Sequence, residues 1–203
     1  MGAKTLLTTI AVVSMLLTAC TSADAGISAS GEASPTASET LTPPSPTPTP
    51  SPSLTPLTDE ELEAALPDEV FYESLPAAIA FANFFIKESY AILQSRDPRV
   101  YEAVSRDSCT FCRSSLEYLN VVEDNQYDVQ GATVTTDLTR STGGLQNDDK
   151  WWVTIPIELA ATKLYDAEGA LLETHDTEAV TVTFVLEYED PFWSAVEVGV
   201  SDS

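Results

Sequence analysis

The central helix of this chain is predicted by the stretch PAAIAFANFFIKESYAILQS, Pro76 to Ser95. Polar residues recur along one stripe of it, and apolar residues recur along another at the spacing of an α-helix. The apolar stripe holds Ala78, Ala82, Phe85 and Ile92, and the apolar side is widened by Phe81, Phe84 and Ile86. Because this side is far wider than a narrow seam, we expect the helix to lie across a β-sheet.

Shorter helices are expected on both sides of the central one. Thr58 is followed three residues later by Glu61, which is the spacing of a capping box at the start of a helix. A short helix is expected after Pro98, and another runs through Cys112 to about Glu123. The first half of the folded chain is therefore predicted to be helical.

From Tyr127 onward the apolar residues recur at every second position, which indicates β-strands. The alternation is clearest in WWVTIPIELA, residues 151–160, and in AVTVTFVLEY, residues 179–188. Pro156 favours an edge position or a bulge, because proline lacks the N–H that a strand residue donates. The alternation slips by one residue at Gly131, which predicts a β-bulge in the first strand.

These elements predict an α+β domain in which three N-terminal helices pack on a curved antiparallel sheet of about four strands. The stretch YDAEGALLETHD, residues 165–176, is interpreted as a hairpin turn or loop, and EDPFW, residues 189–193, as a second tight connection. A bulged, curved sheet that wraps one long apolar helix is similar to the cone-shaped fold of nuclear transport factor 2-like proteins.

A family resemblance is carried by the run LPAAIAFANFFIKESYAILQSRDPRVYEAVSRDSCTFC, residues 75–112. It resembles the start of a family of actinobacterial lipoproteins catalogued as domain of unknown function 6318. In that family an aromatic-rich helix leads to a short helix and then to a Cys-x-x-Cys pair. The resemblance covers most of residues 58–203 and implies a location and a fold. It implies no activity, because the family has none that could be transferred.

The first residues have the layout of a secretory signal peptide. Lys4 supplies a positive charge, Thr5 to Leu17 form an apolar stretch, and Leu-Thr-Ala-Cys follows at residues 17–20. The apolar stretch is too short to remain as a membrane anchor. Its end resembles the lipobox of bacterial lipoproteins, in which the cysteine becomes the lipidated first residue. We therefore expect a lipoprotein signal peptide over residues 1–19 and a lipid on Cys20, the alternative being a plain cleaved signal with an incidental cysteine.

Residues 20–57 are expected to form a disordered tether between the lipid and the domain. Eight of the thirteen prolines lie between Pro35 and Pro56, where they alternate with serine and threonine. So few residues there are apolar that burial cannot offset the entropy of ordering. The folded part is then a single domain over residues 58–203. The lipid on Cys20 would hold it outside the cytoplasm, in the cell envelope.

The chain is strongly acidic, with a formal net charge of −23. Residues 58–203 hold 29 of the 32 acidic residues and eight of the nine basic ones, so the domain carries about −21. Such a surface repels phosphate backbones and anionic headgroups. Nucleic acid is therefore excluded as a partner, and we attribute the acidic surface to solubility in a salty or wall-bound setting.

Cys109 and Cys112 form a Cys-x-x-Cys pair with three interpretations. A zinc site needs four ligands, and with the first cysteine lipidated only these two and His175 remain, so no metal is expected. Arg106 and Arg113 beside the pair, and the start of a helix, favour a redox centre. The helical flanks, however, are unlike the setting of thioredoxin-like motifs. We favour a structural disulfide, because exported thiols meet an oxidising environment.

Four aromatic residues are the candidates for a pocket or interaction surface: Tyr90, Tyr118, Trp151 and Trp152. The two tyrosines are also candidate acid–base groups, although a tyrosine that caps the core with a wet hydroxyl is the simpler interpretation. The two tryptophans point to opposite faces of one strand, so only one can lie in the core. The other is covered by a helix or marks a surface for a partner or ligand.

Three other polar residues are weaker candidates for chemistry. Asp137 and Glu158 are expected on the solvent side of their strands. His175 lies in the polar stretch ETHDTE and is expected to be a solvated residue rather than a base.

The sequence therefore predicts a membrane-anchored extracytoplasmic lipoprotein with a non-catalytic binding or interaction domain, no catalytic residues and no cofactor. Its partner is expected to be a small ligand, a cell-wall component or a protein. One alternative is an isomerase- or dehydratase-like enzyme, which requires an acid–base group in a closed apolar pocket. Another is an exported thiol–disulfide protein, which requires an exposed Cys109. A shallow or filled pocket with an exposed tryptophan favours the interaction module.

Overall fold

The computed structural model describes residues 54–202, and the central helix in it is α2, Leu75–Ser95. Ser74 caps this helix, because its hydroxyl accepts a hydrogen bond from the Ala77 N–H at 3.2 Å. A proline in the first turn costs no hydrogen bond there. The helix ends at Arg96, which adopts the left-handed conformation with φ of 58°.

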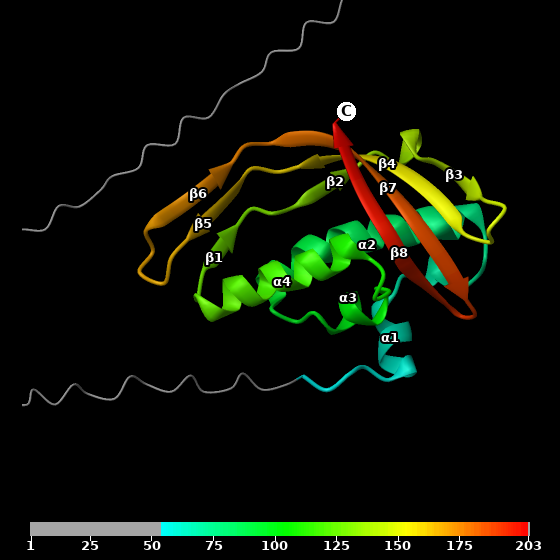
Figure 1. Ribbon diagram of the computed structural model, residues 1–203, viewed down its shortest axis with the longest axis horizontal. Helices are drawn as coiled ribbons and strands as arrows, with labels where there is room; N and C mark the ends of the chain where they lie inside the picture. Colours follow the sequence, from blue (N-terminus) through cyan, green and yellow to red (C-terminus); the bar gives the residue numbers. More distant parts are fainter. Residues whose placement is uncertain (1–53, 203) are drawn as a thin grey trace, which may run out of the picture. The chain divides into compact units, whose positions relative to one another are not determined.

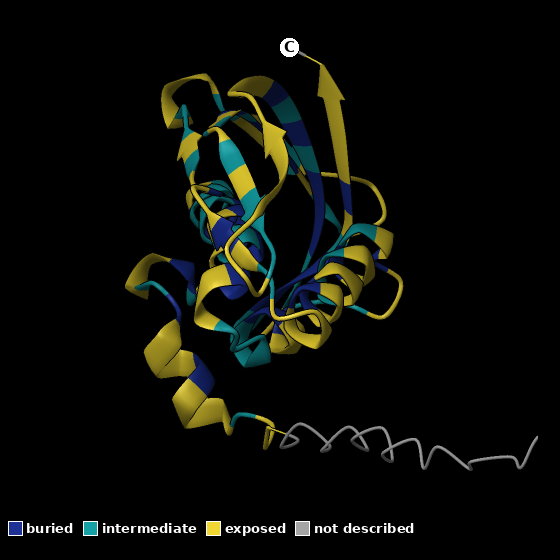
Figure 2. Cartoon of the chain, turned by 90° about the vertical axis from the view of Figure 1, so that its left-hand side faces the viewer, coloured by how far each residue is buried: buried dark blue, intermediate teal, exposed yellow. Residues whose placement is uncertain are grey.

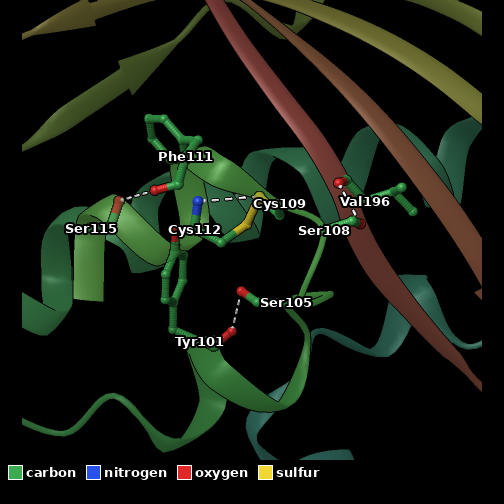
Figure 3. The surroundings of a disulfide bond; sticks show 8 residues. All are labelled: Tyr101, Ser105, Ser108, Cys109, Phe111, Cys112, Ser115 and Val196. Atoms are coloured by element: carbon green, nitrogen blue, oxygen red, sulfur yellow. Dashed lines mark hydrogen bonds between the residues drawn. A yellow bond between two sulfur atoms is a disulfide. The ribbon is translucent and has the colours of Figure 1, made fainter. Parts of the chain in front are cut away.

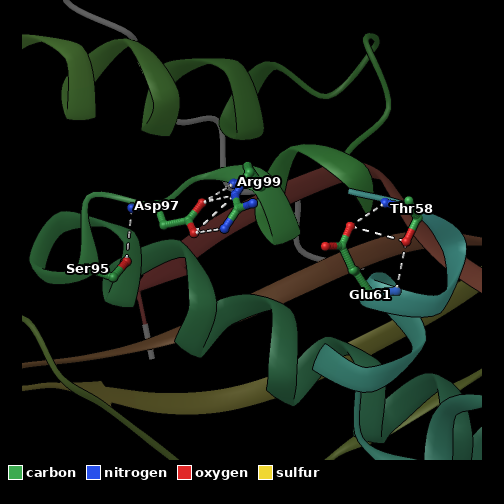
Figure 4. A network of polar contacts seen from close by, with 5 residues as sticks. All are labelled: Thr58, Glu61, Ser95, Asp97 and Arg99. Carbon is green, nitrogen blue, oxygen red and sulfur yellow. Dashed lines mark hydrogen bonds and ion pairs between the residues drawn. The ribbon is translucent and has the colours of Figure 1, made fainter. Parts of the chain in front are cut away.

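The described part of the chain holds three further α-helices and two short 3-10 helices. They are α1 (Asp59–Ala65), η1 (Asp68–Val70), α3 (Arg99–Ala103), α4 (Thr110–Asp124) and η2 (Leu138–Arg140). The predicted capping box is confirmed at α1 (Figure 4). The Thr58 hydroxyl accepts from the Glu61 N–H at 3.3 Å, and the Glu61 carboxylate accepts from the Thr58 N–H at 2.9 Å. Before α3, the Asp97 carboxylate binds the Arg99 guanidinium at 2.6 Å (Figure 4).

Eight strands in residues 54–202 form two antiparallel sheets (Figure 1). The larger sheet has the order β2-β4-β7-β8, with β3 also paired to β4, and the smaller sheet has the order β1-β5-β6. The strands are β1 (Asp128–Gln130), β2 (Val134–Thr136), β3 (Thr142–Leu145), β4 (Trp151–Leu159), β5 (Thr162–Tyr165), β6 (Leu171–His175), β7 (Glu178–Glu189) and β8 (Phe192–Asp202). The fold is therefore α+β, as predicted.

The element counts differ from the three helices and roughly four strands that the sequence suggests. The expected bulge at Gly131 is a break, because Gly131 and Ala132 both have positive φ, 87° and 51°. The first strand consequently divides into β1 in the smaller sheet and β2 in the larger. A side chain at Gly131 would collide with the Ala161 carbonyl oxygen, so this close approach requires glycine. The stretch expected as a hairpin turn or loop is a hairpin that includes the strand β6.

Pro156 lies in an internal strand rather than at an edge. One side of β4 pairs with β7, and the other side pairs first with β3, up to Thr154, and then with β2, from Ile157. Pro156 falls between these two partners, where its carbonyl accepts from the Asp137 N–H at 2.9 Å. The nitrogen of a strand residue points to the same side as its carbonyl, so the proline interrupts no ladder hydrogen bond.

The main core lies between α2 and the larger sheet, and the helices cover only one face of that sheet (Figures 1 and 2). The predicted alternation of β4 is confirmed: Val153, Ile155 and Ile157 are buried, whereas Trp152 and Glu158 are exposed on the outer face. Aromatic rings from α2, β7 and β8 fill the centre of this core.

No helix within residues 54–202 combines the length and the apolar character needed to cross a membrane. The signal peptide predicted over residues 1–19, the lipidated Cys20 and the tether up to residue 53 lie outside the described residues, so these three assignments stay predictions.

Candidate functional site

A pocket of about 270 Å³ opens between α2, α4 and the smaller sheet. In Figure 1 this is the region where β1, β5 and β6 arch over α4 and the end of α2. The side chains that line it are mostly apolar or aromatic, with titratable groups from β6, β7 and the connection between them. They are Tyr90, Leu93, Tyr118, Val129, Ala132, Leu159, Ala160, Thr162, His175, Asp176 and Glu178. The pocket is therefore open, with apolar walls and a polar rim.

Two side chains at the C-terminal end of α2 position one wall of the pocket, which consists of β1 and the break after it at Gly131. The Gln94 amide donates to the Gly131 carbonyl at 2.7 Å, and the Arg96 guanidinium donates to the Tyr127 carbonyl at 2.6 Å. Both contacts are made to main-chain oxygen atoms, so they position the backbone itself. They keep this wall at a set distance from Tyr90 and Leu93 on the same helix.

Two tyrosine hydroxyls are the polar groups on the helical side of the pocket. Burial raises the pKa of Tyr90, and the neighbouring Glu178 carboxylate raises it further. Burial also raises the pKa of Tyr118, with Glu173 adding to the shift. Neither hydroxyl forms a hydrogen bond to another residue in the described part of the chain. Both phenols therefore stay protonated at neutral pH and are free to bind a ligand group.

The structure brings together only two of the four aromatic candidates, because the tyrosines line the pocket and the tryptophans lie at the far end of β4. The Trp151 indole N–H donates to the Glu73 carboxylate at 3.2 Å, and its ring packs against Trp193 with centroids 5.9 Å apart. Trp152 is 46% exposed on the outer face of the larger sheet. The two tryptophans thus face opposite ways, as predicted, and neither lines this pocket.

Three titratable lining residues were not expected at a pocket: His175, Asp176 and Glu178. His175 ends β6 and Glu178 begins β7, so the short connection between the strands carries all three to the rim. The His175 ring lies 3.2 Å from the Glu173 carboxylate and is largely exposed. The only signal in the sequence is the polar stretch ETHDTE, which fits a solvated loop equally well. The antiparallel pairing of β5 with β6 decides its position.

Cys109 and Cys112 are joined in a disulfide, as predicted (Figure 3). Cys109 is the N-cap of α4, and its sulfur accepts from the Cys112 N–H at 3.1 Å. The bond therefore closes the first turn of this helix. The preceding loop is anchored to β8, because the Ser108 hydroxyl donates to the Val196 carbonyl at 3.2 Å (Figure 3) and the Arg106 N–H donates to a β8 carbonyl at 2.9 Å.

A second cavity, of about 490 Å³, lies beside the disulfide. Its lining includes the two arginines that favoured a redox centre, but both are paired with carboxylates. Arg106 lies 3.2 Å from Glu187 and 2.6 Å from Glu189, and Arg113 lies 3.9 Å from Glu117. Both cysteines border this cavity, but they are only 0% and 1% exposed. Thiol–disulfide exchange needs an accessible sulfur, so this geometry favours a structural bond.

The remaining candidates lie away from the pocket. The Asp137 carboxylate accepts from the Thr139 hydroxyl and from the Arg140 guanidinium, each at 2.6 Å. These two contacts hold the pKa of Asp137 below its usual value. Glu158 is exposed on the outer face of β4. Within residues 54–202, no three His, Cys, Asp or Glu side chains gather into a group that could hold a metal ion.

The fold and the pocket together define an α+β domain with a small open site between two helices and curved antiparallel sheets. The model of a family of unknown function, DUF6318, matches residues 65–199. The chain belongs to this family. No curated protein matches the chain in sequence.

Several solved structures are distantly similar to the chain. The intermembrane space region of the chloroplast protein ARC6 is 14% identical with a TM-score of 0.43, and the match covers 61% of this chain and 95% of that one. The protein Aln2 from a Streptomyces species is 10% identical with a TM-score of 0.40, covering 64% and 94%. A periplasmic fragment of TraM is 13% identical with a TM-score of 0.41, covering 65% and 100%.

Proposed function

We propose that this chain is a membrane-anchored extracytoplasmic lipoprotein whose domain binds a small ligand without catalysing a reaction. In this proposal Cys20 carries the lipid, the tether spans the cell envelope, and the domain has the cone-shaped nuclear transport factor 2-like fold of an actinobacterial lipoprotein family. The signal-peptide layout and the Leu-Thr-Ala-Cys sequence support the anchor. The curved sheets over α2 support the cone.

The pocket beside Tyr90 and Tyr118 is the observation that carries the proposal. Ligand sites are concave, mostly apolar and furnished with a few polar groups, and they range over about 300–1,000 Å³. A volume of about 270 Å³ lies just below that range, so the ligand is small. The two phenols supply the few directed polar contacts.

Binding is favoured over the isomerase- or dehydratase-like alternative because the pocket lacks a sheltered acid–base group. Such a catalyst works best when burial or a neighbouring charge brings its pKa near neutrality. The carboxylates of Asp176 and Glu178 are exposed at the rim. The more sheltered Tyr90 has its pKa raised, which moves it away from neutrality and keeps its proton in place.

The test is native mass spectrometry of the full-length protein purified from its own membranes. Ala160→Phe fills the pocket, and Ala179→Phe is the matched control, because Ala179 is exposed and lies outside the pocket lining. We expect a bound small molecule on the natural protein and on the Ala179→Phe variant, and none on Ala160→Phe. A natural protein that carries no ligand, or a ligand retained by Ala160→Phe, would contradict the proposal.

The anchor is tested separately by Cys20→Ala. We expect this variant to lose a lipid-sized mass and to leave the membrane fraction, while a Ser22→Ala control keeps both. A Cys20→Ala protein that stays in the membrane fraction with an unchanged modification would rule out lipidation at this residue.

A further inference from the structure

The rim of the pocket carries negative charge on the side of the sheets. The carboxylates of Asp176 and Glu178 lie in the lining, and Glu173 stands nearby, 3.2 Å from the His175 ring. This charge acts on the two tyrosines of the pocket. Glu178 of β7 adds to the raised pKa of Tyr90, and Glu173 of β6 adds to that of Tyr118. The negative potential therefore reaches the interior of the pocket as well as its surface.

No lysine or arginine side chain lines the pocket in the described part of the chain. The basic group in the lining is the His175 ring, which is already paired with Glu173. The domain as a whole carries about −21, so its wider field has the same sign as the rim. An anionic ligand would meet repulsion on approach, and inside the pocket it would meet the two phenol O–H groups but no lysine or arginine.

The interior offers aromatic and apolar surface behind this rim. Leu93, Val129 and Leu159 form apolar walls that would bury a hydrocarbon body. The rings of Tyr90 and Tyr118 provide electron-rich faces, and such faces attract ammonium groups. The oxygen of each unpaired phenol can also accept a hydrogen bond from an N–H.

We infer that the pocket takes an organic cation, an amine or ammonium compound whose charged head meets Asp176 and Glu178 and whose apolar body enters between the helices and the sheets. The inference rests on the proposed function, since it names the ligand class of that same pocket. The pocket, the carboxylates at its rim and its aromatic rings all suit an organic cation. A neutral apolar ligand would make no charge interaction with the rim carboxylates.

The experiment compares three probes that share one ring and differ in charge: 4-methylbenzylamine, 4-methylbenzyl alcohol and 4-methylbenzoate. Each is titrated into the full-length chain in a non-ionic detergent at pH 7, and binding is followed by NMR shifts of the Tyr90 and Tyr118 rings. We expect the amine to bind at least ten times more tightly than the alcohol, and the benzoate to give no saturable shift.

Charge-removing variants locate the effect. In the double variant Asp176→Asn/Glu178→Gln the affinity for the amine should fall about tenfold, the size expected for two exposed charge pairs, while the affinity for the alcohol stays the same. The matched control, Glu158→Gln/Glu197→Gln, removes two charges from residues outside the pocket lining and should change neither affinity.

The outcomes separate the ligand class from the existence of a site. If the alcohol or the benzoate binds as tightly as the amine, or the double variant binds the amine unchanged, the cation inference is wrong and the proposed function stands. If the amine gives no saturable shift, the inference is also wrong. The proposed function then depends on the co-purified ligand and the Ala160→Phe variant alone.

Discussion

The two ends of α2 differ in what fills the space beside them. At the closed end, residues 75–86 of α2 face the larger sheet, and aromatic rings occupy the space between them. The Phe85 ring lies 4.8 Å from that of Tyr101 and 6.3 Å from that of Phe184, measured between centroids. At the open end, Tyr90 and Leu93 line a pocket whose opposite wall includes residues of the smaller sheet.

Side-chain volume explains this difference. Opposite the open end, the sheet side of the pocket presents several small residues, Val129, Ala132, Ala160 and Thr162. The strand β6 is exposed at each of its five residues, so it adds little to a core. The closed end therefore holds most of the stability, and the open end is left available for binding.

The largest effect should come from removing an aromatic ring at the closed end. Phe85→Ala should lower the free energy of unfolding by about 4 kcal/mol, because a fully buried ring is lost and a cavity replaces it. The matched change at the open end, Leu172→Ala, removes an exposed side chain of β6 and should stay within about 0.5 kcal/mol. Urea unfolding followed by tryptophan fluorescence measures both.

Equal losses of unfolding free energy in the two variants would contradict the difference between the closed and open ends of α2. They would mean that the smaller sheet and its exposed strand stabilise the fold as much as the aromatic core does.

The sequence predicted the parts of the fold that depend on a single element. The alternation of residues 151–160 located β4 and its faces, because a period of two specifies burial within one strand. The spacing of Thr58 and Glu61 located the start of α1 in the same way. An irregularity was correctly predicted at Gly131, but as a bulge within one strand; the division into two sheets was missed, since it depends on which strands pair.

Only the tyrosines of the candidate site could be predicted from the sequence. Tyr90 and Tyr118 were candidates because a tyrosine commonly packs its ring on the core and leaves its hydroxyl in water, so their position at a pocket could be anticipated. Asp176 and Glu178 could not, because a polar stretch between strands has no fixed direction until the strands pair. The neutralisation of Arg106 by two carboxylates from β7 was hidden for the same reason.

The second largest effect should come from the disulfide. Cys109→Ala/Cys112→Ala should lower the free energy of unfolding by about 2 kcal/mol, the value that the loop-closure formula assigns to so short a loop. The control Ser108→Ala removes one hydrogen bond of the same loop and should cost less than about 1 kcal/mol.

The same double variant also tests whether the disulfide influences the pocket at the open end. Because the disulfide closes only the first turn of α4, the NMR signals of the Tyr118 ring, two turns further on, should stay in place. A shifted Tyr118 signal would show that the disulfide also shapes the pocket.

A gain in stability is expected from Tyr101→Phe at the closed end. The Tyr101 side chain is fully buried, and its hydroxyl makes no well-formed hydrogen bond within residues 54–202, although the Ser115 hydroxyl lies close enough to lower its pKa. Removing this oxygen should raise the free energy of unfolding by about 1 kcal/mol at pH 7. Tyr188→Phe is the control, because its exposed hydroxyl donates to Asp190 at 3.3 Å and should bring no gain.

The pH dependence of the Tyr101→Phe variant provides a second check. Burial raises the pKa of Tyr101 from 10.0 to about 12, so the unfolded chain releases this proton at a lower pH than the folded one. The contribution of the protonated Tyr101 side chain to the free energy of unfolding is therefore fully present below pH 10 and is lost as the pH rises from 10 to 12. The phenylalanine variant should show a smaller decrease over the same range, and an identical decrease would contradict the assignment.

The smallest effect concerns the electrostatics of the open end. Glu178→Gln should lower the pKa of Tyr90, because the neutral amide no longer opposes the charge of the phenolate. Burial is the larger cause and remains, so the pKa should stay above its usual value. The shift of the Tyr90 ζ-carbon followed against pH by NMR measures this change, with Glu197→Gln as a control outside the pocket lining. An unchanged titration would mean that the charge of Glu178 does not reach the Tyr90 hydroxyl. The carboxylates at the rim and the phenol on α2 would then have no electrostatic interaction.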